Sequence, residues 1–226
     1  MRALADAGSP GSSRPFRSGV RAAVPYAIAT GLVGVSFGIL ARPVMGAVAA
    51  IVMSAIVFAG SAQFAALAVL SAGGGAVPAI AAGILLNLRF VPMGIAMAPS
   101  LRAGPLGRAL RGQALVDASW AMANRGEGRF DIPFLMGATA LQYPAWLLGT
   151  VAGALGAGVI GDPDRFGLDA IFPAFFLGLL AHELSRQRAR GVALVGGVIA
   201  VALTPVAPAG VPILAAALAA LLGLRR

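Results

Sequence analysis

The chain has no cysteine and no lysine, only one histidine, and charged residues make up just 11% of its 226 residues. Without cysteine, disulfides, thiolate catalysis and cysteine-based metal sites are excluded, and one histidine cannot form an imidazole cluster. Without lysine there is no GxxxxGK[ST] phosphate loop, which excludes ATP-driven transport by this chain alone. We therefore expect no resident metal, no cofactor and no enzymatic activity.

Apolar residues dominate instead, at 59% of the chain. Long apolar stretches follow one another with short polar breaks, which is typical of a polytopic membrane protein. We expect an all-α fold with about five to seven transmembrane helices, including discontinuous or re-entrant segments. Residues 1–19 are polar and predict a disordered cytoplasmic tail, and residues 20–226 predict one integral membrane transport domain.

The apolar segments expected from this pattern are Val20–Ala41, Val44–Ser71, Ala76–Ser100, Ile132–Ile160, Gly167–Leu184 and Gly191–Leu224. A shorter mixed piece, Gln113–Asn124, lies between the third and the fourth. The spacing of Gly34 and Gly38, and of Gly149 and Gly153, predicts close helix packing.

All 17 basic residues are arginines, and most of them cluster between apolar segments, as topology signals do, so nucleic-acid binding is not expected. The arginines before the first segment predict a cytoplasmic N-terminus and a multi-pass protein of the cytoplasmic membrane. A second arginine group follows Ala76–Ser100 and would lie outside if Val44–Ser71 crossed once. A fold-back near residues 59–63 restores cytoplasmic placement, and Pro205 divides residues 191–224 in a similar way. Both stretches can be full spans or re-entrant hairpins.

Arg89 lies near the middle of Ala76–Ser100, roughly 20 Å along it as a helix. A guanidinium at bilayer depth costs about 2.5–3.5 kcal/mol on insertion scales and usually faces a protein-lined cavity. Pro92 removes the amide that would bond the carbonyl of Leu88, so we expect a local opening where Asn87 and Arg89 converge. A structural arginine bonded to nearby carbonyls is the alternative.

Two further candidates for a solute site are a small-residue break and an acid. Gly60, Ser61 and Gln63 follow the expected break, where helix N-terminal amides can hold an anion, although Gln63 could simply bridge helices. Asp117 lies in a short apolar piece beside Trp120. It could bind an ammonium group, pair with Arg89 or carry a coupling proton, or it could face water at an interface.

Several of these stretches together resemble the AzlC-type (azaleucine-resistance) branched-chain amino acid permeases. They are the runs 58–64 (FAGSAQF) and 86–90 (LNLRF), Pro99 and the region of Asp117. The resemblance implies a secondary transporter that exports branched-chain or other small apolar amino acids together with a small AzlD-type membrane protein. Two neighbours differ from the common family pattern, Ala118 in place of an acid and Phe90 in place of a histidine.

The residues can meet the needs of such a zwitterionic solute. Arg89 and the break at residues 60–63 would hold its carboxylate, and Asp117 its ammonium group. Phe58, Phe64 and Met93 would surround its apolar tail. A passive channel and a non-transporting assembly subunit remain the alternatives.

Overall fold

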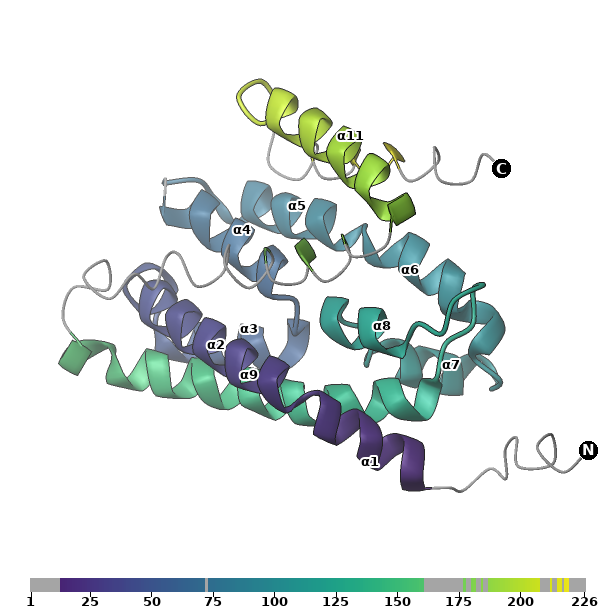
Figure 1. The fold of residues 1–226 in the computed structure, drawn as a ribbon. Coiled ribbons are helices and arrows are strands. Elements are labelled where there is room, and N and C mark those ends of the chain that lie inside the picture. Colours follow the sequence, from purple (N-terminus) through teal and green to yellow (C-terminus); the bar gives the residue numbers. More distant parts are fainter. Residues whose placement is uncertain are drawn as a thin grey trace, which may run out of the picture. The chain divides into compact units, whose positions relative to one another are not determined.

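The computed structural model of the chain is built from helices, and the all-α class is confirmed (Figure 1). It describes residues 13–71, 73–160 and 187–207, together with 177, 180, 181, 184, 212, 215, 216, 218 and 219. Within these residues the only β-type pairing is an isolated bridge between Asn124 and Phe130. The chain divides into two compact units. Unit 1 comprises Met1–Ile28 and Met93–Pro144, and unit 2 comprises Ala29–Pro92 and Ala145–Arg226.

Unit 1 begins with α1 (Ser13–Ala22), which corrects two expectations. Residues 13–19 are helical rather than part of a disordered tail, and the first apolar helix, α2 (Val24–Met45), begins four residues later than expected. Pro25 explains the boundary, since it lacks the amide that would continue α1 but is tolerated in the first turn of α2. Gly19 lies so close to the Phe134 backbone that a Cβ would overlap its carbonyl oxygen.

The rest of unit 1 contains the short elements that follow Pro92. They are η1 (Ala98–Ser100), α7 (Pro105–Gly112), α8 (Asp117–Ala123) and the first half of α9 (Ile132–Ile160). The arginine-rich stretch before residue 113 includes α7. Pro105 in the first turn of that helix supplies the reason, because its fixed φ suits a helix start. Segment Ile132–Ile160 is confirmed, and Pro144 does not end the helix.

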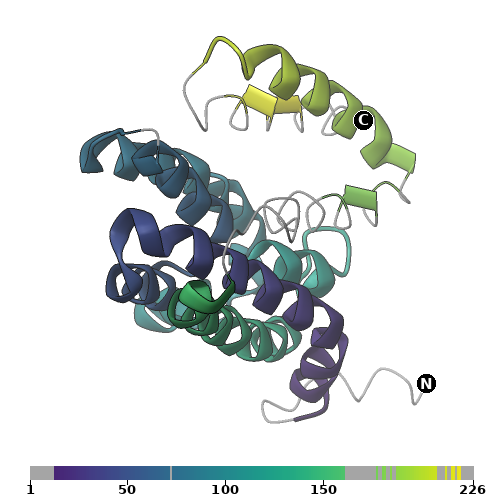
Figure 2. The same ribbon diagram turned by 90° about the vertical axis from the view of Figure 1, so that its left-hand side faces the viewer.

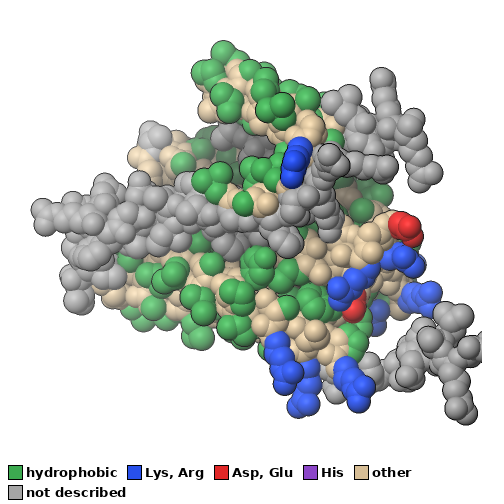
Figure 3. Space-filling model, in the orientation of Figure 1, with side chains coloured by type: hydrophobic (Ala, Val, Ile, Leu, Met, Phe, Trp, Pro, Cys, Tyr) green, Lys and Arg blue, Asp and Glu red, His purple; other side chains and the backbone are tan. Residues whose placement is uncertain are grey.

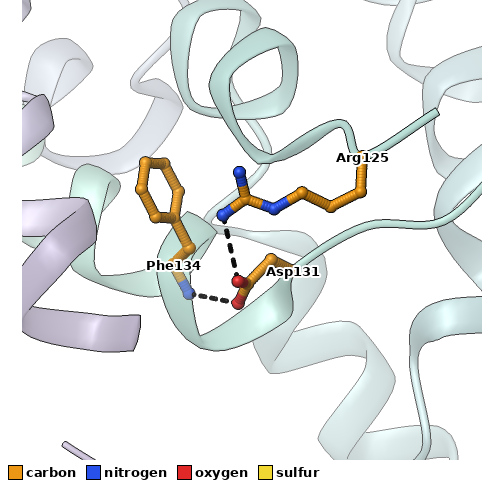
Figure 4. A network of polar contacts seen from close by, with 3 residues as sticks. All are labelled: Arg125, Asp131 and Phe134. Carbon is orange, nitrogen blue, oxygen red and sulfur yellow. Dashed lines mark hydrogen bonds and ion pairs between the residues drawn. The ribbon is translucent and has the colours of Figure 1, made fainter. Parts of the chain in front are cut away.

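A tight loop leads into α9 and is closed by a small polar network (Figure 4). The carboxylate of Asp131 accepts a hydrogen bond from the Phe134 amide at 3.0 Å and forms an ion pair with Arg125 at 3.1 Å. The guanidinium of Arg125 also lies 4.9 Å from the centre of the Phe134 ring. Asp131 therefore acts as the N-cap of α9, satisfying an amide that the helix itself leaves free.

In unit 2, α2 packs against the second half of α9 through glycines on both helices. An added Cβ on Gly34 would lie 2.5 Å from the carbonyl oxygen of Trp146, and one on Gly38 would lie 2.6 Å from the amide of Ala154. Gly149 and Gly153 on α9 approach the α2 backbone as closely. Both glycine pairs predicted from the sequence thus pack helices, and they pack against each other.

The remaining apolar elements of unit 2 are short, and the last of them, α6, continues into unit 1 from Met93. α3 (Ala47–Val57) and α4 (Gly60–Ser71) replace the expected segment Val44–Ser71, and α5 (Ala76–Asn87) and α6 (Phe90–Met97) replace most of Ala76–Ser100. α4 and α5 lie side by side in both ribbon views (Figure 2). At 11 and 12 residues, α3 and α4 are about 16 and 18 Å long, too short to cross a hydrocarbon core of about 30 Å singly.

Two stretches among the described residues are long and apolar enough to cross a membrane, Val24–Met45 and Ala76–Ser100. Along α5 and α6 the branched side chains Val77, Ile84 and Ile95 are 79%, 57% and 69% exposed. Hydrophobic side chains likewise cover the visible faces of α2 and α9, whereas basic side chains gather over α1 (Figure 3). Apolar surface on this scale suits contact with lipid or with other membrane proteins.

Near the C-terminus, α11 (Gln187–Leu203) ends in a turn at Thr204–Val206, which confirms the stop expected at Pro205. Most of the expected segment Gly167–Leu184, and most of residues 208–226, lie outside the described residues.

Candidate functional site

Two helix breaks in unit 2 form the frame of the candidate site. The first separates α3 from α4 at Phe58 and Ala59, where Phe58 adopts a left-handed conformation with φ 38°. This conformation is strained for a bulky residue, because its Cβ crowds the following carbonyl. The fold-back expected near residues 59–63 is confirmed as a break, and it begins at Phe58.

The second break separates α5 from α6 at Leu88 and Arg89, where Pro92 predicted an opening. The carbonyl of Leu88 cannot receive a hydrogen bond from Pro92, and the amide of Val91 bonds it instead at 3.1 Å. A tighter turn therefore replaces one turn of α-helix. The opening is confirmed, but the Leu88 carbonyl that it was expected to free is occupied.

Arg89 joins the two breaks. Its guanidinium Nη1 donates a hydrogen bond to the hydroxyl of Ser61, in the first turn of α4. The guanidinium carbon also lies 4.9 Å from the centre of the Phe90 ring. Two candidates that are 28 residues apart in the sequence are thus brought into direct contact, with a cation placed at the N-terminal end of a helix. Gly60, the first residue of α4, lies beside this contact and is half-buried.

Gln63 has structural partners on both sides of the first break. Its Oε1 accepts a hydrogen bond from the Ala59 amide at 3.4 Å, and its Nε2 donates to the Ser54 hydroxyl at 2.9 Å. The side chain is fully buried. These contacts fit the bridging alternative considered for Gln63, and a role in solute binding stays a prediction.

Behind Gln63 a chain of hydrogen bonds crosses three helices, and two of its members were not predicted. Ser54 on α3 bonds Thr150 on α9 at 2.9 Å, and the Thr150 hydroxyl donates to the carbonyl of Trp146 at 3.1 Å. Because the Thr150 hydroxyl donates its only hydrogen to that carbonyl, Ser54 is the donor in the bond between the two hydroxyls. A lone serine inside the apolar run of α3 was the available signal for this chain.

Asn87, the last residue of α5, borders a groove rather than joining the contact between Arg89 and Ser61. The groove has a volume of about 430 Å³ and lies between α3, α4 and α5. Ala62, the neighbour of Ser61, also lines it. The Oδ1 atom of Asn87 is buried and has no hydrogen-bond partner among the described residues.

Comparison with known proteins places this chain in a family. The model of the AzlC protein family matches residues 25–160. An uncharacterized membrane protein of Archaeoglobus fulgidus is 34% identical over 211 residues, which cover 92% of this chain and 93% of the relative. The inner membrane protein YgaZ of Escherichia coli is 30% identical over 211 residues, covering 86% and 84% of the two chains. No solved structure matches the chain.

The chain belongs to the AzlC family. It is therefore a membrane protein, as its relatives are named, and its family of membrane permeases supports a role in transport. The family match includes both helix breaks and the contact between Arg89 and Ser61.

The sixth predicted residue of this AzlC-family chain, Asp117, lies in unit 1. It is the first residue of α8 and is half-buried. Nearby, the indole nitrogen of Trp120 donates to the carbonyl of Met93 at 3.3 Å, and its ring lies 5.1 Å from that of Phe130. The role of Asp117 stays a prediction.

The apolar pocket expected from Phe58, Phe64 and Met93 stays a prediction. Phe58 and Phe64 pack against the core cluster around Phe37, and the Phe64 and Phe37 rings lie 5.5 Å apart. Met93 belongs to unit 1. None of the three lines the groove that Asn87 borders. Among the described residues, no group of three or more His, Asp or Glu side chains could hold a metal ion.

Proposed function

We propose that this AzlC-family chain is a secondary transporter of branched-chain or other small apolar amino acids. The contact between Arg89 and Ser61, across two adjacent helix breaks, is the observation that carries the proposal. A fixed cation and a helix N-terminus together favour a carboxylate. Broken helices whose ends face a solute are a recurrent device in membrane transporters.

The contact between Arg89 and Ser61 suits reversible binding of a carboxylate. A hydroxyl can give up the guanidinium when a carboxylate oxygen replaces it, and can then donate its own hydrogen to that oxygen. A bond to a charged group contributes more than a neutral one, about 1.5–3 kcal/mol. The exchange therefore favours the bound solute without leaving Ser61 unsatisfied.

The finer points of the proposal rest on the sequence. Clustered arginines before α2 support a cytoplasmic N-terminus and a place in the cytoplasmic membrane. The absence of a nucleotide-binding loop supports coupling to a gradient rather than to ATP, and no enzymatic activity is proposed. The family resemblance supports export and a small AzlD-type partner. Asp117 is proposed for the ammonium group or for a coupling proton.

Counterflow in proteoliposomes tests the proposal. Vesicles loaded with unlabelled L-leucine, with and without the small partner, should accumulate external labelled L-leucine transiently. Arg89→Ala should lower the apparent affinity at least about tenfold, because it removes a charge-assisted bond to the solute. Ser61→Ala should have a smaller effect, since the cation remains.

Arg129→Ala is the matched control, because it removes an arginine whose side chain is 73% exposed. Each variant is first checked for insertion and a monodisperse elution profile. Unchanged counterflow in an inserted Arg89→Ala protein removes Arg89 from the site. Flux of L-leucine without saturation or counterflow identifies a channel, and absence of flux under both conditions identifies an assembly subunit.

A further inference from the structure

Arg89 and Ser61, which contact each other, do not line the groove between α3, α4 and α5. Each helix contributes one stripe of side chains to it, spaced about one turn apart. α3 contributes Ala49, Met53 and Val57; α4 contributes Ala62, Ala66 and Leu70; α5 contributes Ala79, Gly83 and Asn87. Its volume of about 430 Å³ falls within the range of small-molecule pockets, about 300–1,000 Å³.

Small residues create this hollow. Ala62, Ala66 and Ala79 are buried, and they leave space where larger side chains would close the contact between α4 and α5. On the open side Ile80 and Ile84 are 60% and 57% exposed. The walls are thus apolar and branched, and they suit an apolar group of similar shape.

Asn87 is the polar exception at the end of the α5 stripe. Its buried Oδ1 has no hydrogen-bond partner among the described residues. A buried acceptor without a donor is unfavourable, and more so in hydrocarbon, so a lipid chain would leave this cost in place. A ligand carrying an N–H donor next to an apolar group would remove it.

We infer that the groove selects the transported solute by its side chain. The branched side chain of the amino acid lies between α3, α4 and α5, and its ammonium group donates to Asn87 Oδ1. Of the two roles proposed for Asp117, this leaves the coupling proton. This inference rests on the proposed function and assigns the apolar subsite to Met53, Ala66 and Gly83 rather than to Phe58 and Phe64. Asn87 and Gly83 then determine specificity.

Gly83 offers a direct test. A methyl group added there would lie 3.6 Å from the carbonyl oxygen of Ala62, an ordinary contact, so Gly83→Ala should fold while filling part of the groove. The matched control is Gly94→Ala on α6, where an added methyl meets nothing within 4 Å and the position does not line the groove. Ile84→Ala changes the groove in the opposite direction, by enlarging it.

The half-saturation concentrations of labelled L-leucine and L-alanine are measured for each inserted variant. We expect Gly83→Ala to raise the value for leucine about tenfold while leaving that for alanine within about twofold, because only leucine reaches the filled space. Ile84→Ala should lower the half-saturation concentration of L-phenylalanine relative to that of L-leucine. In competition assays the wild type should prefer L-leucine to its 2-oxo analogue, which lacks the ammonium group, and Asn87→Leu should abolish that preference.

Equal effects of Gly83→Ala on leucine and alanine would overturn the inference, as expected if the groove holds a partner helix. Half-saturation concentrations that Gly83→Ala leaves unchanged for both amino acids would also overturn it, as expected if lipid fills the groove. In both cases wild-type transport of leucine leaves the proposed function standing. If the wild type moves no amino acid, the proposed function and this inference fall together.

Discussion

The glycine contact between α2 and α9 allows a prediction in which one helix supplies both the test and its control. An added Cβ on Gly34 would lie 2.5 Å from the carbonyl oxygen of Trp146, whereas one on Gly31 would lie 3.5 Å from that of Ala145. Both glycines are on α2 and face α9. Gly34→Ala must therefore push the helices apart by about 1 Å, and Gly31→Ala need not.

The difference in the free energy of unfolding between the two variants isolates the cost of overpacking. Replacing glycine by alanine in a helix gains up to about 1 kcal/mol from backbone entropy, and this gain is common to both variants. Overpacking of a close contact costs about 1–3 kcal/mol and applies to Gly34→Ala alone. We therefore expect Gly34→Ala to be less stable than Gly31→Ala by about 1–3 kcal/mol, or about 2–12 °C in melting temperature.

Thermal unfolding of the purified protein in one detergent measures this difference. Tryptophan fluorescence is a suitable signal because Trp146 lies at the contact and the chain has only two tryptophans. Far-UV circular dichroism, recorded in parallel, checks that helix content is unchanged at low temperature. If Gly34→Ala and Gly31→Ala melt at the same temperature, the α2–α9 backbones do not approach as closely as the structure has them.

Two further predictions concern hydrogen bonds. Asp131→Ala should destabilise the fold by about 1 kcal/mol because α9 loses its N-cap. Asp131→Asn should cost less, because it keeps a capping oxygen and loses only the half-exposed ion pair with Arg125. Equal melting temperatures for the two variants would contradict this. Ser54→Ala should cost about 1–2 kcal/mol because Gln63 Nε2 loses its partner in a fully buried position. Thr150→Val should cost less, because Gln63 keeps Ser54. Detergent melts that rank the two variants in reverse would contradict the role of Ser54 as the partner of Gln63.

Sequence reasoning located both helix breaks, and the second has a purely local cause. Pro92 removes one amide, and the consequence at Leu88 follows from the geometry of the helix alone. The first break was harder to place. The fold-back was expected near residues 59–63, yet Phe58 takes the left-handed conformation, which favours glycine, and Gly60 starts the next helix. Packing of the Phe58 ring against the core holds a conformation that propensity disfavours.

What sequence reasoning missed depends on neighbours that are distant in the chain. The polar composition of residues 13–19 predicted disorder, but the fit of Gly19 against the α9 backbone gives this stretch a packed surface. Similarly, the stripes that line the groove read as ordinary apolar faces until three helices are placed together. The glycine pairs were recognisable as contact surfaces, but their spacing does not name the partner helix.

Two arginines in unit 2 differ in their surroundings, and the difference bears on the role proposed for Arg89. Arg42, near the end of α2, donates to the carbonyls of Ala154 and Leu155 at 3.0 and 3.2 Å, so its guanidinium holds one helix against another. Arg89 instead lies on a turn and donates to a side-chain hydroxyl at the start of a different helix. A backbone carbonyl only accepts and would repel a carboxylate, whereas Ser61 can accept from the cation and donate to the solute. An arginine on a turn, beside a hydroxyl that can reverse its hydrogen bond, therefore supports the proposed role of Arg89 in holding the carboxylate of a solute.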